Sequence, residues 1–380
     1  MVESNGDLPA DVIIETLLKL PVKSLIRYRC VCKSWHTLTK NPKFIHKHQQ
    51  EDHNTRLLVY CTFEDENNRN LEMSYFTFFL DETLTDLSTK RLDDPPIMPV
   101  GFVGPYEGIF CLMTGNKYIS LWNLATQELR HLPKCRASLP PYTMIHNSSA
   151  GFGLDLVSND YKLVLILTLL DIKIDFYYDF SHIAVYNLST DSWRGFRGFK
   201  LGRDYICGRL DSTYLNGVCY WLAREEGDNH VIISFNLSDE MIQNIKSPCT
   251  PELTHGPLGL YDNSLSLIAL DEIKKCYHLW MMKEMCWIKQ FTIGPFVEAY
   301  NPLGLWKNGE IFLESSAGEL LLYDPNTQEM RDLGLRGLWF YVHCFKESLL
   351  TIKREGKLLD IYFYRTYQKS IETSSKIYSY

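Results

Sequence analysis

A few side chains in this 380-residue chain have the types and close spacing that catalysis or metal binding requires. They are the pairs His46-x-His48, Cys30-x-Cys32, Asp93-Asp94 and Glu225-Glu226. Adjacency does not place two carboxylates on opposite sides of a bond, as paired-carboxylate hydrolysis needs. The cysteines are too close for a usual zinc knuckle, so we interpret them as small buried residues and the histidines as solvated.

Motifs that would identify an enzyme are absent. The chain contains no G-x-S-x-G nucleophile elbow, H-E-x-x-H zinc motif, G-x-x-x-x-G-K-[ST] phosphate loop or G-x-G-x-x-G dinucleotide fingerprint. We therefore predict a non-catalytic binding protein with no metal site and no cofactor.

Composition predicts a globular protein rich in β structure. Apolar residues make up 45 % of the chain and charged residues 22 %, and 23 Tyr and 19 Phe favour strands. The longest apolar run, Leu163 to Leu170, is too short to span a bilayer. The first residues lack a basic flank followed by an apolar core, so we do not expect a secretory signal. Eleven scattered cysteines without a C-x-x-C pair favour a reducing setting. We expect a cytoplasmic location, with the nucleus as an alternative.

Charge is divided unevenly along the chain. Residues 1–50 carry eight Lys or Arg against four Asp or Glu, a net of +4, whereas residues 51–380 carry a net of −11. Nucleic-acid binding requires a basic surface for phosphates, so the acidic part is unsuited to it. A basic protein is the partner that this charge favours.

A short apolar segment, Leu8 to Ile45, stands near the start of the chain. Ile13, Ile14, Leu17 and Leu18 follow the spacing of one helix face. About forty residues is the lower limit of what can bury a core of its own. We expect this segment to form short helices that contact another chain.

From Leu57 onward, short β-prone runs alternate with turn residues. Evenly spaced strands without amphipathic helices favour a sandwich, barrel or propeller. A repeat decides among these, because four stretches share an aromatic residue, an Asn or Asp, a turn and a return to apolar residues, which encodes a hairpin. They begin at Trp122, Tyr186, Phe235 and Tyr323, with a degenerate copy at Leu279 to Trp287. Successive spacings of 64, 49, 45 and 43 residues are typical of propeller blades.

We predict an all-β, propeller-like domain of about six kelch-like blades over residues 57–352, with seven as an open alternative. The hairpins give five blades between about residues 100 and 336. A sixth forms if Val342 to Ile352 pairs with Leu57 to Leu80, which closes the ring and removes exposed sheet edges. Residues 51–56 are predicted as a linker, and residues 353–380 as a tail that could add one strand.

The helical segment resembles an F-box. The features that carry the resemblance are Leu8-Pro9, Leu20-Pro21, Lys23-Ser24-Leu25, Val31-Cys32-Lys33-Ser34-Trp35 and Pro42-x-Phe44. The resemblance implies a small all-α domain of three short helices over residues 1–50, which docks on a Skp-type adaptor of a cullin-RING ubiquitin ligase. It assigns adaptor contact, or its immediate support, to Leu8, Pro9, Ile13, Leu17, Pro21, Leu25, Ile26 and Val31. Trp35 and Phe44 are expected to hold the helices together.

The downstream domain resembles the plant F-box-associated (type 1) domain. The matching elements are Gly151-Phe-Gly-Leu-Asp, Val185-Tyr-Asn-Leu-Ser-Thr-Asp-Ser-Trp193, Leu215-Asn-Gly-Val-Cys-Tyr-Trp221, Leu303-Gly-Leu-Trp306 and Tyr323-Asp-Pro. The chain is most similar to S-locus F-box and S-locus F-box-like proteins. This implies a substrate-recognition subunit of an SCF (Skp–cullin–F-box) ubiquitin ligase that binds a basic ribonuclease in pollen self-incompatibility, although unrelated substrate adaptors share the same motifs.

Three insertions are candidates for substrate contact, because propellers bind through loops at one end of the ring. They are Asp171 to Ser181, Glu64 to Glu72 and Arg224 to Asn229. The first mixes acids with aromatic residues, which suits a basic partner. Its candidate contacts are Asp171, Asp175, Phe176, Tyr177, Tyr178 and Asp179. Alternatively, this segment only extends the third blade as a strand pair.

Two rival functions stay open. The chain could be a ligand- or glycan-binding propeller whose helical segment self-associates, and co-purification with an adaptor would separate that function from the first. A propeller hydrolase or oxidase is disfavoured, because no cysteine–tyrosine, metal or triad pattern can be located.

Overall fold

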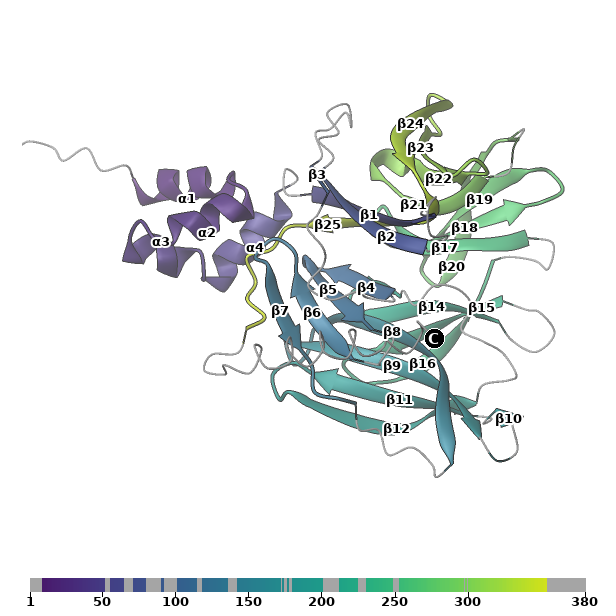
Figure 1. The fold of residues 1–380 in the computed structure, drawn as a ribbon, viewed down its shortest axis with the longest axis horizontal. Coiled ribbons are helices and arrows are strands. Elements are labelled where there is room, and N and C mark those ends of the chain that lie inside the picture. The colour runs from purple at the N-terminus through teal and green to yellow at the C-terminus, as the bar shows by residue number, and fades with distance from the viewer. Residues whose placement is uncertain are drawn as a thin grey trace, which may run out of the picture.

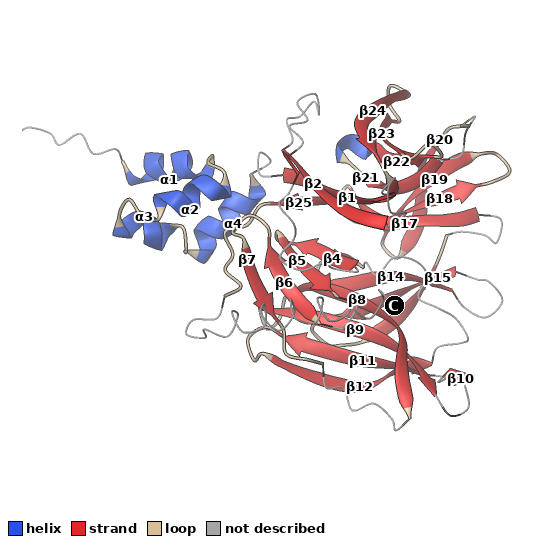
Figure 2. Ribbon diagram, viewed as in Figure 1, coloured by secondary structure: helices blue, strands red, loops and turns tan. Residues whose placement is uncertain are grey.

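The computed structural model describes residues 9–51, 55–64, 71–79, 90–91, 101–114, 118–135, 142–171, 173, 176–177, 180–200, 212–224, 230–248, 253–296, 298 and 300–353 of the chain. Figure 1 shows a helical head at one end of a ring of sheets. Figure 2 shows that the long helices gather in the head and the strands in the ring.

Four helices form the head, and the prediction of three was wrong. They are α1 (Ala10–Leu18), α2 (Val22–Tyr28), α3 (Lys33–Leu38) and α4 (Pro42–Gln50). The fourth helix begins at Pro42 because proline is favourable at a first helical position. The Asn41 side chain supports this start by accepting the Lys43 N–H at 2.9 Å.

Three smaller predictions about this region were also wrong. His48 lies in α4 and is buried, with its Nε2 atom 2.8 Å from the Leu20 carbonyl oxygen. Cys30 and Cys32 are exposed, because they lie in the connection between α2 and α3. The predicted linker 51–56 is shorter, since the first strand begins at Thr55.

The strands of the ring form six sheets. Sheet A runs in the order β25 (Leu338–Lys346), β1 (Thr55–Glu64), β2 (Leu71–Phe79) and β3 (Lys90–Arg91). Sheet B contains β4 (Gly101–Tyr106), β5 (Ile109–Met113), β6 (Ile119–Asn123) and β7 (Glu128–His131). Sheet C contains β8 (Thr143–Asp155), β9 (Asp160–Asp171), β10 (Phe176–Tyr177), β11 (Phe180–Asn187) and β12 (Ser192–Lys200).

The other three sheets follow in chain order. Sheet D contains β13 (Thr213–Leu215), β14 (Val218–Arg224), β15 (His230–Asn236) and β16 (Ile242–Lys246). Sheet E contains β17 (Leu253–Tyr261), β18 (Ser264–Asp271), β19 (Cys276–Lys283) and β20 (Cys286–Ile293). Sheet F contains β21 (Tyr300–Leu305), β22 (Ile311–Ser315), β23 (Glu319–Asp324) and β24 (Glu329–Arg336), with a short 3-10 turn at Lys307–Gly309.

The two ends of the ring domain meet in sheet A. β1 pairs antiparallel with β25, with Val59 opposite Val342, as predicted for these segments. Residues 347–352, which were assigned to the same strand, leave the sheet instead. Sheets B to F are the five consecutive units counted from the hairpins, and the described strands contain no seventh sheet.

The repeated aromatic-Asx stretches form the turn between the third and fourth strands of a sheet. The side chains of Asn123, Asn236 and Asp324 each accept the backbone N–H two residues on, at 2.8 to 3.0 Å. These bonds satisfy backbone donors that the turn would otherwise leave unpaired. The local sequence therefore stabilises these three hairpins from within a few residues.

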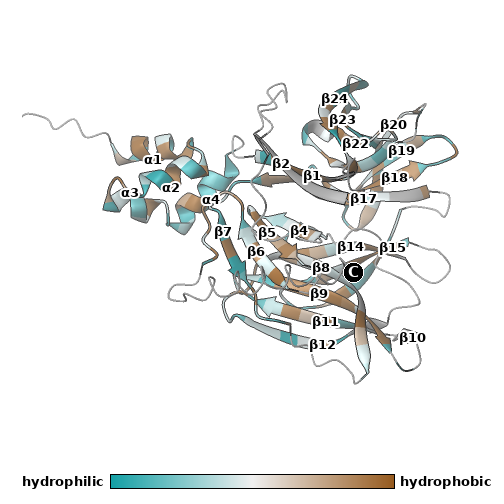
Figure 3. Cartoon of the chain, viewed as in Figure 1, coloured by the Kyte–Doolittle hydropathy of each residue, from teal (hydrophilic) through white to brown (hydrophobic). Residues whose placement is uncertain are grey.

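Apolar clusters lie at all six interfaces between neighbouring sheets, from sheets A and B round to sheets F and A. Trp221, with 1 % of its surface exposed, is the largest fully buried side chain. Figure 3 shows apolar residues along strands such as β5, β9 and β18. Burial of each large aliphatic side chain contributes about 1.5 to 3 kcal/mol, so these clusters hold neighbouring sheets together.

Two further observations concern the chain's environment. None of the helices in the described ranges is both long and apolar enough to cross a membrane. Nine of the eleven cysteines lie in these ranges, and all nine are free thiols.

Candidate functional site

The ring has two distinct ends. Neighbouring strands within each sheet are antiparallel, so the turns between first and second strands lie at one end and those between second and third strands at the other. The head docks at the first end, where the Gly108 turn approaches Lys346 and Ser348. We call the other end the distal face. Figure 1 shows β10, which belongs to a distal connection, on the side away from the head.

The head exposes part of the predicted adaptor surface. Pro9, Pro21 and Val31 are exposed, and Val31 keeps 63 % of its surface accessible. Both prolines also start helices, since the Pro9 carbonyl accepts the N–H of Val12 at 3.0 Å and the Pro21 carbonyl that of Ser24 at 2.9 Å. These residues are available to another chain.

Other predicted adaptor residues point inward. Leu17 and Leu25 are 2 % and 0 % exposed and form the core of the head with Phe44, while Ile13 and Ile26 are half-buried against them. Leu17 and Leu25 therefore support the surface from beneath. Trp35 also packs on this core, so the expected role of Trp35 and Phe44 in holding the helices together is confirmed. Leu8 lies outside the described residues.

Sequence reasoning missed two exposed apolar residues of the head. Val12 is 46 % exposed and Tyr28 is 39 % exposed, with the Tyr28 ring 5.6 Å from that of Trp35. Val12 borders a shallow groove along α1 with Asp11, Glu15, Thr16, Lys19 and Leu20. The missed signal was that Val12 falls off the inward Ile13-Leu17 stripe, so an apolar residue there faces outward.

Residues 347–353, which we call the junction segment, leave β25 and run against the head. Leu349 is 2 % exposed and belongs to the apolar core of the head. The Gln49 side chain donates to Ser348 Oγ at 2.7 Å, and Lys346 Nζ donates to the Gln50 carbonyl oxygen at 3.2 Å. The last helix of the head is thus bonded to the end of the ring domain.

The junction segment is bonded to sheet B on its other side. The buried Asn123 amide donates to the carbonyl oxygens of Ser348 and Leu350, at 3.1 and 2.8 Å. The Glu128 carboxylate accepts the backbone N–H of Ile352 at 2.9 Å. Head and ring are therefore joined twice, by the chain between α4 and β1 and by the junction segment.

The predicted substrate segment lies on the distal face. The half-buried Asp171 carboxylate accepts the Lys173 N–H at 2.8 Å. Phe176 and Tyr177 form β10, which pairs with the end of β9 and extends sheet C, as the alternative interpretation predicted. Asp175, Tyr178 and Asp179 lie outside the described residues. Segments 64–72 and 224–229 also connect second to third strands, and the strand ends that flank them lie at the same end of the ring.

The distal face also carries exposed apolar side chains that sequence reasoning missed. They are Tyr142, which precedes β8, Met144 of β8, Ile273 of the β18–β19 turn, and Leu338 and Trp339 of β25. Lys173 Nζ lies 3.3 Å from the centroid of the Tyr142 ring. Exposed Tyr and Trp are the side chains most enriched among binding hot spots. No local pattern separates them from buried strand residues, because exposure depends on where each strand ends.

Trp339 has an unusual backbone. Its φ of +54° lies in the left-handed region, where a non-glycine residue costs of order 1 to 3 kcal/mol. The Glu314 carboxylate accepts the Trp339 N–H at 2.8 Å and holds this conformation. The side chain is 58 % exposed, so burial does not compensate for the strain. Thirteen other non-glycine residues of the described ranges also have a positive φ, so it is the exposure of the ring, and not the backbone alone, that makes Trp339 a candidate contact.

Comparison with known proteins agrees with this architecture. Residues 6–47 match the F-box domain, and residues 82–370 match the F-box associated beta propeller domain. The F-box/kelch-repeat protein At3g23880 of Arabidopsis thaliana is 25 % identical over 84 % of this chain and 88 % of its own length. The F-box protein At3g07870 of the same plant is 24 % identical over 88 % and 89 %.

Two other matches are partial. The putative F-box protein At3g16210 of Arabidopsis thaliana is 26 % identical, and the match spans 63 % of this chain and 61 % of that protein. The solved structure of TolB from Acinetobacter baumannii has a TM-score of 0.49 and 11 % identity, over 79 % of this chain and 70 % of that chain. With a matched F-box domain at the head and a matched domain over most of the ring, this chain belongs to the F-box proteins that carry an F-box associated beta propeller domain.

Proposed function

We propose that this chain is the substrate-recognition subunit of an SCF ubiquitin ligase. The head binds a Skp-type adaptor, and through it a cullin-RING ligase, while the distal face binds a protein substrate. The observation that carries the proposal is the junction segment, which ties the head to one end of the ring and leaves the distal face pointing away. Such a subunit needs no nucleophile, because it acts by raising the local concentration of substrate near the conjugating enzyme.

The adaptor surface combines exposed residues with a supporting layer. We assign contact to Leu8, Pro9, Val12, Pro21 and Val31, and support to Ile13, Leu17, Leu25 and Ile26. Three well-buried aliphatic anchors would contribute several kcal/mol at about 1.5 to 3 kcal/mol each. Binding of the adaptor would cover the exposed apolar side chains of the head.

Co-purification with a Skp-type adaptor tests the head. The double variant Leu8→Ala with Pro9→Ala is expected to lose the adaptor while its ring melts as in the wild type. The matched control is Val157→Ala, which truncates an exposed apolar residue on the β8–β9 turn and should retain the adaptor. Recovery of the adaptor by the double variant at wild-type yield would contradict the assignment.

The substrate is proposed to be a basic protein. Residues 51–380 carry a net charge of −11, and the distal face combines this acidic background with exposed Tyr142 and Trp339. The resemblance to S-locus F-box proteins favours a basic ribonuclease of pollen self-incompatibility. A panel of basic and acidic proteins, immobilised and probed with the full chain, would test this preference, and equal binding to both classes would contradict it.

A second candidate function is a ligand- or glycan-binding propeller with a self-associating head. The exposed Val12 and Val31 also fit a contact between two copies of the head. Light scattering separates the two functions. A monomer that forms a one-to-one complex with the adaptor supports the ligase subunit, whereas a dimer that excludes the adaptor supports self-association.

A further inference from the structure

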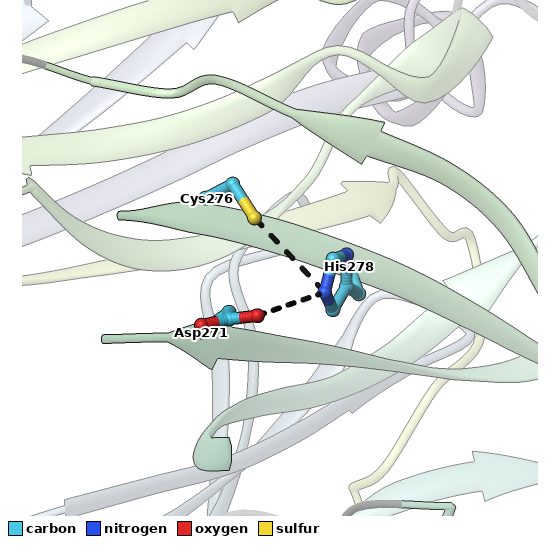
Figure 4. Close-up of side chains that lie close together, drawn as sticks. All are labelled: Asp271, Cys276 and His278. Atoms are coloured by element: carbon cyan, nitrogen blue, oxygen red, sulfur yellow. Dashed lines mark hydrogen bonds and ion pairs between the residues drawn. The ribbon is translucent and has the colours of Figure 1, made fainter. Parts of the chain in front are cut away.

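Three potential metal ligands meet on sheet E, at the distal face. Asp271 ends β18, and Cys276 and His278 lie at the start of β19. The antiparallel register sets Asp271 opposite Cys276, and His278 follows two residues later on the same face of the sheet. Figure 4 shows the three side chains converging. All three are buried, with 7 %, 4 % and 6 % of their surfaces exposed.

Their donor atoms have the spacing of a coordination site. His278 Nε2 lies 3.7 Å from Asp271 Oδ2 and 4.0 Å from Cys276 Sγ, and all three donor atoms lie within 4.8 Å of one another. Metal–ligand bonds of 2.0 to 2.3 Å place neighbouring ligands of a tetrahedral zinc ion about 3.3 to 3.8 Å apart. The existing side chains therefore need to approach by only about 1 Å or less.

We propose that Asp271, Cys276 and His278 bind one Zn²⁺ ion, with water as the fourth ligand. A thiolate, an imidazole and a carboxylate together suit zinc, whereas Mg²⁺ and Ca²⁺ prefer oxygen ligands alone. The site is independent of the adaptor surface, which lies on the head. It revises the expectation of no metal site, because Asp-x4-Cys-x-His becomes a cluster only through the register of β18 and β19.

Neighbouring groups orient two of the ligands. His278 Nδ1 is 2.9 Å from Thr292 Oγ1, which positions the ring with Nε2 toward the cluster. The Lys274 N–H donates to Asp271 Oδ1 at 2.9 Å and leaves Oδ2 on the side of the cluster. Second-shell bonds of this type fix first-shell ligands in metal sites.

Lys274 is the group that a metal ion must displace. Its Nζ lies 3.0 Å from Asp271 Oδ2, but the side chain is 72 % exposed and can swing into solvent. Lys289 of β20 is a second cation near the cluster, and it interacts electrostatically with Cys276 and His278. Zinc binding must release one proton from the Cys276 sulfur, because the thiolate is the form that ligates metal.

A bound zinc ion would clamp the turn at residues 272–275. This turn carries Ile273, which is 83 % exposed on the distal face. Coordination from both strands would hold the base of the turn closed and orient this apolar side chain toward a substrate. The proposed ion would thus stabilise this turn, with water in the one position that the three protein ligands leave open.

Calorimetric titration of the chelator-treated full chain with ZnCl₂ tests the proposal. The wild type should bind one equivalent, and Cys276→Ser and His278→Ala should each weaken binding at least about tenfold. Lys274→Met removes the competing cation and should strengthen binding. The matched control Cys286→Ser, an exposed thiol on β20, should bind as the wild type does. Thermal melts verify that each variant is folded.

Cobalt(II) substitution supplies a second readout, because sulfur-to-cobalt charge transfer reports thiolate ligation directly. The absorption band should appear in the wild type and in Cys286→Ser and be absent from folded Cys276→Ser. Absence of stoichiometric zinc binding by the wild type would overturn the proposal. So would a charge-transfer band that persists in Cys276→Ser, or wild-type affinity in both ligand variants.

Discussion

The side-chain amide of Gln49 donates a 2.7 Å hydrogen bond to Ser348 Oγ, across 299 positions of sequence. Gln49 belongs to the last helix of the head, and Ser348 follows the last strand of the ring. Buried Leu349 adds an apolar contact to the same junction. The junction therefore fixes the head relative to the ring, and under the proposed function it would hold the substrate at a constant distance from the adaptor.

Leu349→Ala is expected to loosen the head from the ring. Truncation of a buried leucine lowers the free energy of unfolding by about 2 to 5 kcal/mol. Here the lost contacts are those between the junction segment and the head. Limited proteolysis should show faster cleavage near residues 51–55 while adaptor binding persists. The control Leu338→Ala truncates a leucine that is 42 % exposed and should leave cleavage unchanged. Equal cleavage rates in wild type and Leu349→Ala would contradict a role for Leu349 in holding the head against the ring.

Gly108→Ala should damage the same junction through the backbone. A Cβ at Gly108 would lie 2.6 Å from the Lys346 carbonyl oxygen, at a φ of +74°. Gly334 has a nearly equal φ of +72° but open space around its Cβ position. Gly334→Ala should therefore lose only about 1 to 2 kcal/mol of unfolding free energy from backbone strain. Denaturation of both variants separates the cost of the contact with Lys346 from the cost of backbone strain. Equal losses of unfolding free energy would show that the contact adds no cost.

Trp339→Gly is expected to stabilise the chain while weakening substrate capture. Glycine tolerates the positive φ, so the unfolding free energy should rise by about 1 kcal/mol. Removal of the exposed ring deletes a proposed substrate anchor. Trp339→Ala is the matched control, because it removes the ring but retains the strain. Full capture by both variants would exclude Trp339 from the substrate site.

Neutralising the acids of the predicted substrate segment should mimic high salt. The triple variant of Asp171, Asp175 and Asp179 to Asn is expected to bind a basic protein more weakly, and added salt should weaken it less than the wild type. Asp239→Asn with Asp262→Asn removes exposed acids from head-side turns and serves as the control. Binding that is insensitive to salt in the wild type would contradict an electrostatic contact.

Asp155 should make stability depend on acid pH. Lys162 Nζ lies 2.8 Å from its Oδ2 atom, and both side chains are buried. Burial alone would raise the pKa of Asp155, but hydrogen bonds from Lys162, Ser158 and Ser238 outweigh it and hold that pKa well below its usual range. A carboxyl group whose pKa is lowered by folding stabilises the folded state at any pH above its unfolded pKa, which is about 3.9 for Asp. This stabilisation is lost as the pH falls from that value toward the pKa of the folded state.

Asp155→Asn therefore should lose about 3 to 5 kcal/mol of unfolding free energy at neutral pH. The difference in unfolding free energy between the variant and the wild type should shrink as the pH falls below about 4, because Asp155 of the unfolded wild type takes up a proton there. Urea unfolding across this range measures the effect, with Asp262→Asn as the control for loss of an exposed carboxylate. A difference that stays constant with pH would assign the stability to packing instead.

The amino-acid sequence by itself determined the local elements. Prolines and apolar spacing located the first helices, and the aromatic-Asx stretches located the hairpins at Asn123, Asn236 and Asp324, because these signals act within a few residues. The pairing of the two ends of the ring could also be predicted, since it removes unpaired sheet edges that would invite aggregation.

Only the tertiary structure decided which of these residues are accessible and which distant ones meet. Leu17 and Val31 are equally apolar in sequence, yet one is buried in the head and the other is exposed. The Gln49–Ser348 bond joins residues 299 positions apart, and Asp271 meets His278 only through strand register. Exposure and long-range contact are properties of the packed chain, because they depend on what the rest of the molecule covers.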